Sequence, residues 1–261
     1  MKTKEQVYKL DAVLFDFDGV LINTIPFHGR AWAWIMKEQF GISLDDSIGA
    51  VTEGLRSEQI IKLILAKAHG IEKTKTKKEL QSIIEWKRRY YREIVGPLEL
   101  DQSIYTMLQK IKQRVRKIGL VTSTNRNNLD HIISESKRSI FDFVSHGETS
   151  EKVKPEPDPF LFAARSLNAS PERTLVIENS ILGIRAARAS GMWCAAISST
   201  LAPKLLHEAH ILFHSTLEIV ETKNWKKMLQ LFAERGAPGS LQVKREALLE
   251  NIRARIKILD N

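Results

Sequence analysis

The 261-residue chain contains few residues of several types, and each scarcity excludes a class of protein. A single cysteine, Cys194, excludes an internal disulfide and a zinc cluster built from cysteines. With 13 glycines and 8 prolines, the chain is neither collagen-like nor dominated by linkers. No apolar run approaches the roughly 20 residues that a membrane-spanning helix needs, and the first residues lack the apolar run of a signal peptide. We therefore expect a cytoplasmic protein without a membrane partner.

The rest of the composition is typical of a folded globular chain. Hydrophobic residues make up 43% and charged residues 27%, which excludes global disorder. The length allows one large domain or two unequal ones. Lysine and arginine outnumber aspartate and glutamate by 40 to 31, and the net charge of +9 predicts attraction to anions. A solvated basic surface, a phosphorylated small molecule and a nucleic acid all fit this charge.

Short apolar runs alternate with helical patterns along most of the chain. The runs that we expect to be strands are 12–17, 118–122, 174–178 and 193–197, with weaker candidates at 141–144 and 211–213. The helical patterns between them are 102–116, 158–167 and 182–189. Because the runs are apolar on both faces, they are typical of a parallel sheet covered by helices. We expect an α/β fold with a doubly wound, Rossmann-like parallel sheet.

One long stretch, residues 25–98, breaks this alternation. It carries helical patterns at 28–39, 57–69 and 77–93 without a convincing strand, and it is too long for a strand-to-helix loop. We therefore expect an inserted α-helical domain at 25–98, with the core formed by 1–24 and 99–235. A helix is expected at 216–233. Residues 236–261 read as a linker, GAPGS, and an amphipathic helix over 241–259 that includes Val243 and fits either docking onto the chain or a dimer contact.

Polar residues follow the first two core strands. Asp16 and Asp18 lie two residues apart and so point to the same side. Two such carboxylates repel each other unless a cation or a shared proton stabilises them, and Mg²⁺ suits an oxygen-rich site. The plain alternative is a turn at Asp18-Gly19. Thr122 ends the next strand, where a hydroxyl and exposed backbone N–H groups form either a phosphate site or a helix cap.

Two further segments carry charged or polar residues in comparable places. Lys154 lies in VKPEPDPF, whose prolines would fix the direction of its ammonium. A fixed ammonium neutralises a phosphoryl oxygen as a compact charge, although a solvent-facing lysine is the alternative. Glu178 and Asn179 end another strand and would lie near the aspartates if the strands are parallel neighbours, or would cap the next helix. Together these segments carry the residue types that phosphoryl transfer needs.

With these four segments the chain resembles the haloacid dehalogenase superfamily, most of all the branch with β-phosphoglucomutase and phosphoglycolate phosphatase. The matching runs, in order, are FDFDGVLINT followed by His28 and Ala31-Trp32, VTSTN, VKPEPDPF and VIENSILGIRAARASGM. The resemblance extends over residues 11–220. It implies a Mg²⁺-dependent phosphatase for a small phosphorylated metabolite, with a sugar-phosphate mutase as the alternative.

The resemblance also implies a role for each matched residue. The inserted domain would be a cap that closes over the site and selects the substrate. The expected roles are nucleophile for Asp16, general acid and base for Asp18, phosphoryl binding for Thr122 and the Ser123 backbone, and charge compensation for Lys154. The expected ligands of Mg²⁺ are Asp16, the Asp18 carbonyl, Glu178 and Asn179. The candidate substrate contacts from the cap are His28, Arg56 and Lys87, with a hinge role for His28 and solvation of the other two as alternatives.

Two positions, Asn179 and Asp18, affect which activity of the family we expect for this chain. The family usually has aspartate where Asn179 stands, and an uncharged amide should bind Mg²⁺ more weakly. A third possibility is therefore a weakened protein that binds nucleic acid or a partner. The retained Asp18 argues against carbon–halogen and carbon–phosphorus cleavage, because relatives with those activities lack it. The basic run at 110–117 falls on the outer face of a helix, so we do not expect nucleic acid, and we expect a monomer or a homodimer.

Overall fold

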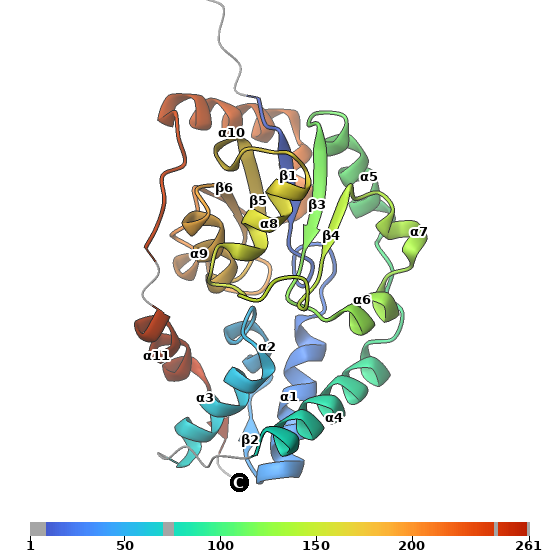
Figure 1. Ribbon diagram of the computed structural model, residues 1–261, viewed down its shortest axis with the longest axis vertical. Helices are drawn as coiled ribbons and strands as arrows, with labels where there is room; N and C mark the ends of the chain where they lie inside the picture. Colours follow the sequence, from blue (N-terminus) through green and yellow to red (C-terminus); the bar gives the residue numbers. More distant parts are fainter. Residues whose placement is uncertain (1–8, 70–75, 243–244, 260–261) are drawn as a thin grey trace, which may run out of the picture.

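A computed structural model describes residues 9–69, 76–242 and 245–259. Within these ranges a parallel sheet forms one half of the molecule and a helical domain the other half (Figure 1). The strands are β1 (Ala12–Phe15), β3 (Lys117–Val121), β4 (Phe143–Ser145), β5 (Thr174–Glu178), β6 (Trp193–Ile197) and β7 (Ile211–Phe213). The expected α/β fold with a parallel sheet is confirmed.

The strand order of the sheet, β4-β3-β1-β5-β6-β7, fixes where a ligand binds. All pairings are parallel, and β1 lies between β3 and β5. The chain therefore winds away from β1 in both directions, and the carboxyl ends of these three strands are neighbours. Open α/β sheets bind ligands at such a switch point.

Helices cover both faces of the sheet because alternate strand residues point in opposite directions. Phe15 packs in the apolar cluster that holds residues of α5 (Gln102–Lys112) and α10 (Thr222–Arg235). Leu14 and Cys194 pack in the cluster on α8 (Asp158–Ser166) and α9 (Ile181–Ala189). Shorter elements complete the core: α6 (Arg126–Ile132), α7 (Glu135–Arg138) and 3₁₀ turns at Pro171–Arg173, Pro203–Leu205 and Thr216–Val220.

The helix expected at 216–233 is two elements, and that prediction is wrong in this respect. A 3₁₀ turn over Thr216–Val220 precedes α10, and the backbone of Glu221 between them is extended at ψ 129°. Ser215 and Glu218 form a capping box on the 3₁₀ turn. This local capping favours a separate turn over a continuous helix, although both segments have apolar residues at helical spacing.

Among the described residues, four helices between β1 and α5 make up the inserted helical part, here called the cap. They are α1 (Ile25–Phe40), α2 (Ile48–Val51), α3 (Ser57–His69) and α4 (Lys77–Val95). The cap has its own apolar cluster, in which Trp32, Ile61 and Ile84 are buried. The expectation of no strand in this stretch is wrong for β2 (Ser43–Leu44), which is too short to show a period-two pattern.

The C-terminal segment docks onto the cap. The helix α11 (Arg245–Arg255) packs on α3 and buries Leu248 and Ile252 in the cap cluster. The strand β8 (Ile258–Leu259) pairs antiparallel with β2, so the helix expected over 241–259 is wrong at its end: the helix stops at Arg255, and the last apolar residues join a sheet. On the core side, the carbonyl of Pro238 lies 2.9 Å from His210 Nε2. The tail therefore returns from the core to the cap (Figure 1). Val243 of the expected amphipathic pattern lies outside the described residues.

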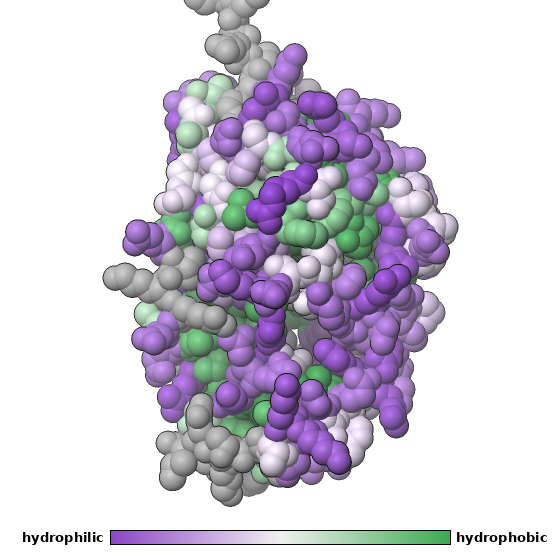
Figure 2. Space-filling view, in the orientation of Figure 1, coloured by the Kyte–Doolittle hydropathy of each residue, from purple (hydrophilic) through white to green (hydrophobic). Residues whose placement is uncertain are grey.

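Charge pairing and hydropathy describe part of the surface of the molecule. No helix of the described ranges is long and apolar enough to cross a bilayer. The face shown in Figure 2 is mainly hydrophilic, with apolar groups in smaller areas. Within the basic run at 110–117, Lys112 and Lys117 pair with Asp142 at 3.4 and 3.2 Å. Part of this positive charge is thus compensated within the chain.

Candidate active site

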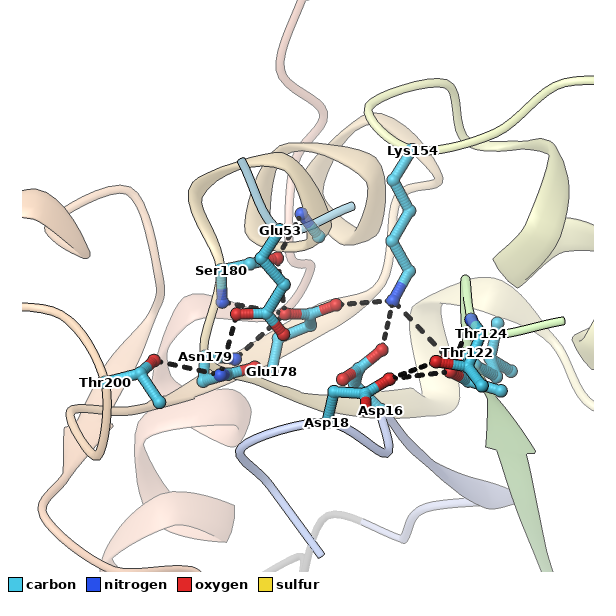
Figure 3. Close-up of polar contacts among 12 residues, drawn as sticks. Asp16, Asp18, Glu53, Thr122, Thr124, Lys154, Glu178, Asn179, Ser180 and Thr200 are labelled. Carbon is cyan, nitrogen blue, oxygen red and sulfur yellow. Dashed lines mark hydrogen bonds and ion pairs between the residues drawn. The ribbon is translucent and has the colours of Figure 1, made fainter. Parts of the chain in front are cut away.

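Polar side chains from neighbouring strand ends meet at the switch point (Figure 3). Asp16 and Asp18 follow β1, Thr122 follows β3, and Glu178 is the last residue of β5. Lys154 reaches them from the loop before α8. A cavity of about 700 Å³, lined by both core and cap residues, opens beside Asp16, Asp18 and Lys154. The structure thus brings together side chains from all four matched segments of the sequence.

The ammonium of Lys154 lies between two carboxylates. Its Nζ donates to Asp16 Oδ1 at 2.5 Å, to Glu178 Oε1 at 2.6 Å and to the Val121 carbonyl at 3.3 Å. The side chain is only 3% exposed, which excludes the alternative of a solvent-facing lysine. Burial would lower the pKa of Lys154, but Asp16 and Glu178 together outweigh burial and raise it. The group therefore stays charged.

Asp16 keeps one carboxylate oxygen free. The residue is buried, and while Oδ1 binds Lys154, Oδ2 has no hydrogen-bond partner within the described part of the chain. Burial raises the pKa of Asp16, and the charge of Lys154 opposes that rise. An unpartnered buried oxygen is costly. It is available to a cation or to an electrophilic phosphorus atom.

Asp18 is held as a carboxylate by several donors. Thr24 Oγ1 donates to Oδ1, and Thr124 Oγ1 donates to Oδ2 at 2.5 Å. Thr122 Oγ1 lies 3.4 Å from Oδ2, and His28 Nε2 lies 3.5 Å from Oδ1. Burial would raise the pKa of Asp18, but His28 and the threonine hydroxyls lower it to about 2. Asp18 is thus ionised in the free site.

Two of the predicted cap contacts, the buried Lys87 and the half-buried His28, form a chain to Asp18. Lys87 Nζ lies 2.9 Å from His28 Nδ1, and the ring of His28 stacks on Tyr91 at 4.1 Å. Burial lowers the pKa of Lys87 to about 7. Burial, with the charge of Lys87, also lowers the pKa of His28, and Asp18 opposes that effect. Lys87 is buried, so the alternative of a solvated lysine is wrong.

The remaining predicted contacts line the cavity farther out. Arg56 is exposed, and its guanidinium donates to the main-chain carbonyl of Glu151 in a core loop. Ser123 lies in the cavity wall next to Thr124. Arg56 therefore connects the cap to the core at the edge of the cavity, and Ser123 lies where the resemblance expects phosphoryl binding.

The two residues at the end of β5 differ in the hydrogen bonds that their side-chain oxygens accept. Glu178 uses both oxygens, because Oε1 accepts from Lys154 and Oε2 accepts from the backbone N–H groups of Asn179 and Ser180 at 2.8 and 2.9 Å. Asn179 is fully buried, and its Oδ1 has no partner in the described ranges. Asp16 Oδ2 and Asn179 Oδ1 are therefore the oxygens of these residues that have no partner within the described ranges. Carboxylate and amide oxygens are ligands of the type that Mg²⁺ takes, and an oxygen that accepts one hydrogen bond keeps a lone pair for a cation.

The side chains present fit a Mg²⁺ site of mixed donors. No group of three His, Cys, Asp or Glu residues with metal-binding geometry occurs among the described residues. That result agrees with a ligand set in which one donor is an amide and another is the Asp18 carbonyl, since neither belongs to those four types. Gly19 makes the close packing feasible, because a Cβ there would lie 2.2 Å from Asn179 Nδ2.

Sequence reasoning missed Glu53, a cap residue that reaches the same site. Glu53 lies in the loop between α2 and α3, and its Oε2 accepts a hydrogen bond from Asn179 Nδ2 at 3.1 Å (Figure 3). Burial, together with the charges of Asp16, Glu178 and Asp18, raises its pKa. Thr24, Thr124 and Thr200 were also missed. The sequence shows only that each of them carries a hydroxyl near a matched motif, and it does not show where that hydroxyl points.

A family model described as haloacid dehalogenase-like hydrolase matches residues 13–197, from β1 through β6. The chain belongs to this family. It is an enzyme that acts on phosphate esters, and the resemblance seen in the sequence is confirmed. Membership thereby decides against the alternative of a protein that only binds nucleic acid or a partner.

Relatives place the chain among phosphomutases and phosphatases of this family. It is 31% identical over 217 residues to a β-phosphoglucomutase of Bacillus subtilis, covering 76% of this chain and 95% of the relative. It is 26% identical to a phosphorylated carbohydrates phosphatase of Thermotoga maritima, covering 70% and 82%. A solved structure of a candidate β-phosphoglucomutase from Bacteroides vulgatus superimposes with a TM-score of 0.71 at 29% identity, covering 87% and 91%.

Proposed function

We propose that this enzyme is a Mg²⁺-dependent phosphatase that hydrolyses a small, sugar-phosphate-like metabolite through an aspartyl-phosphate on Asp16. The observation that carries the proposal is the free, buried Oδ2 of Asp16 at the cavity, with Lys154 bound to the other oxygen at 2.5 Å. A carboxylate approaches a phosphate dianion only when cations offset the repulsion. Lys154 supplies one such charge.

Mg²⁺ would be held by Asn179 Oδ1, by the Asp18 carbonyl and by Asp16 Oδ1, which Lys154 also contacts, so that Asp16 Oδ2 stays free to attack phosphorus. Glu178 beside them orients Lys154. When bound, the ion supplies a second positive charge at the phosphoryl oxygens. We assign binding of the same oxygens to the Thr122 hydroxyl and the Ser123 backbone, because Ser123 lines the cavity and Thr122 lies beside Asp18. Glu178, the further ligand predicted from the sequence, stays a predicted ligand, because a carboxylate oxygen that accepts one hydrogen bond keeps another lone pair.

In the first half-reaction, Asp16 Oδ2 attacks phosphorus while the bond to the substrate oxygen breaks. The leaving oxygen takes a proton from Asp18, so Asp18 must first be protonated. Its pKa of about 2 applies to the free site, and an arriving phosphate dianion raises it by like-charge repulsion. In the second half-reaction, Asp18 accepts a proton from water as that water attacks phosphorus. Phosphate and the free Asp16 carboxylate result.

The cap supplies the wall opposite these groups. His28 and Lys87 lie beside Asp18, and Arg56 lies at the cavity edge, so we assign all three to substrate contact. A small metabolite fits the cavity of about 700 Å³. The cytoplasmic location and the monomeric or homodimeric state stay predictions.

The test is release of inorganic phosphate from a panel of sugar phosphates and phosphoglycolate. We expect release from at least one compound with Mg²⁺ and loss of release after chelation. Asp16→Asn should lower the rate by at least about a thousandfold while the circular dichroism spectrum stays unchanged. Release by Asp16→Asn at the rate of the unmodified enzyme would remove Asp16 from the nucleophile role.

A sugar-phosphate mutase is the second candidate, favoured by 31% identity over 95% of the Bacillus subtilis β-phosphoglucomutase. In a mutase the phosphoryl group on Asp16 passes to a sugar hydroxyl instead of water. Steady phosphate release without a sugar bisphosphate supports the phosphatase. Isomerisation of a sugar phosphate that depends on a bisphosphate activator supports the mutase.

A further inference from the structure

The amide of Asn179 has a defined orientation because both of its N–H groups have acceptors. Nδ2 donates to Glu53 Oε2 at 3.1 Å and to Thr200 Oγ1 at 3.0 Å. The opposite atom, Oδ1, is buried and has no partner in the part of the chain that is described. The hydrogen bonds therefore direct the nitrogen toward the cap and Thr200 and leave the oxygen free.

The loop that carries Glu53 is in direct contact with the core. Its next residue, Gly54, has a φ of +87°, and a Cβ there would lie 3.1 Å from Leu182 Cβ and 3.7 Å from Lys154 Cβ. Only glycine adopts this backbone easily at such a short distance. The Glu53–Asn179 hydrogen bond is thus made where the cap touches the core, between residues 126 positions apart.

From these contacts we propose that Glu53 is a positioning residue that holds the cap against the core and orients the Asn179 amide. The pair also gives a physical reason for an asparagine at position 179. An aspartate there would set its carboxylate against that of Glu53 and would have no hydrogen to donate. The Glu53 carboxylate of the cap and the Asn179 amide of the core are therefore a matched acceptor and donor. The inference rests on the proposed function only where it concerns Mg²⁺, since the cap–core contact needs no metal.

Because the hydrogen bond has a direction, exchanging the two side-chain types tests it. Asn179→Asp places two carboxylates together and should release the loop, whereas Glu53→Gln keeps an acceptor oxygen. In the double variant Glu53→Gln/Asn179→Asp, the glutamine amide donates to the aspartate, so the bond forms in the reverse direction. Glu53→Ala removes the acceptor without adding repulsion. Glu58→Ala, an exposed glutamate five residues along the same segment, is the matched control.

The readout is amide hydrogen exchange of residues 52–56, measured by mass spectrometry without substrate, with circular dichroism to verify folding. We expect exchange to rise roughly ten- to a hundredfold in Asn179→Asp and Glu53→Ala, as for loss of a hydrogen bond to a charged group. Exchange should stay within about threefold of the unmodified enzyme in Glu53→Gln, in Glu58→Ala and in the double variant. Exchange in the double variant as fast as in Asn179→Asp, or no rise in Glu53→Ala, overturns the inference.

Calorimetric titration with MgCl₂ separates this inference from the proposed function. If the amide is oriented by Glu53, Glu53→Ala should bind Mg²⁺ more weakly than Glu58→Ala, by roughly ten- to a hundredfold, as for loss of a residue that supports a metal ligand. Absence of Mg²⁺ binding in every variant, the unmodified enzyme included, contradicts the proposed function. The exchange pattern still decides whether Glu53 holds the cap.

Discussion

Replacement of Lys154 by methionine tests the electrostatic centre of the site. The ammonium lies 2.5 Å from Asp16 Oδ1 and 2.6 Å from Glu178 Oε1, and its side chain is 3% exposed. At an effective dielectric constant of about 20, each contact corresponds to ~6.5 kcal/mol of Coulomb attraction, most of which is offset by the cost of burying the charges. Removal of one partner from such a buried pair typically costs about 3–5 kcal/mol. Phe160 near Nζ gives the methionine an apolar neighbour.

Urea unfolding followed by tryptophan fluorescence measures this cost. We expect Lys154→Met to lower the free energy of unfolding by about 3–5 kcal/mol near pH 7.5, without Mg²⁺. The remaining buried carboxylates then have raised pKa values in the folded state, and their destabilising charge appears as the pH rises. The difference between variant and unmodified enzyme should therefore shrink on acidification toward pH 5.

The matched control is Lys152→Met, two residues away. Its side chain is 64% exposed and lies 3.7 Å from Asp158, so we expect a change below about 1 kcal/mol. Lys154→Met should also lower phosphate release by at least about a hundredfold. An equal loss of stability in both variants, or a loss in Lys154→Met that does not depend on pH, would refute the reasoning.

Three further predictions concern groups outside this ion pair. The pKa of Lys87 is lowered to about 7, so between pH 7 and the ordinary lysine range the unfolded chain binds a proton on Lys87 that the folded chain lacks. As the pH rises through this range, the unmodified enzyme should therefore gain free energy of unfolding relative to Lys87→Met. Urea midpoints of the two proteins that change with pH in the same way would contradict this. Ile252 is 1% exposed in the cap cluster, so Ile252→Ala should lower the free energy of unfolding by about 2–5 kcal/mol. Amide hydrogen exchange should become faster in α3 and stay unchanged in β1. Cys194 should resist iodoacetamide in the native state, since burial raises the pKa of its thiol, and rapid alkylation would disprove this.

The sequence by itself determined the core fold and most of the candidate site. Runs apolar on both faces predicted the parallel sheet, because such strands need helices on both sides. Asp16, Thr122 and Glu178 were identifiable because strand ends in such a sheet converge, whatever the details of side-chain packing. Lys154 was identifiable because VKPEPDPF matches a segment of the family that the chain resembles. These features depend on local patterns and on a topology that few alternatives satisfy.

Only the tertiary structure decided how the two domains meet. Nothing in the sequence showed that Glu53 reaches Asn179, because the contact joins residues 126 positions apart and depends on how the cap docks. The sequence likewise did not predict that Lys87 is buried beside His28, or that α11 and β8 dock on the cap. The spacing of apolar residues in the sequence predicts which face of a helix or strand is buried. It does not predict which other element covers that face, because this depends on how the whole chain packs.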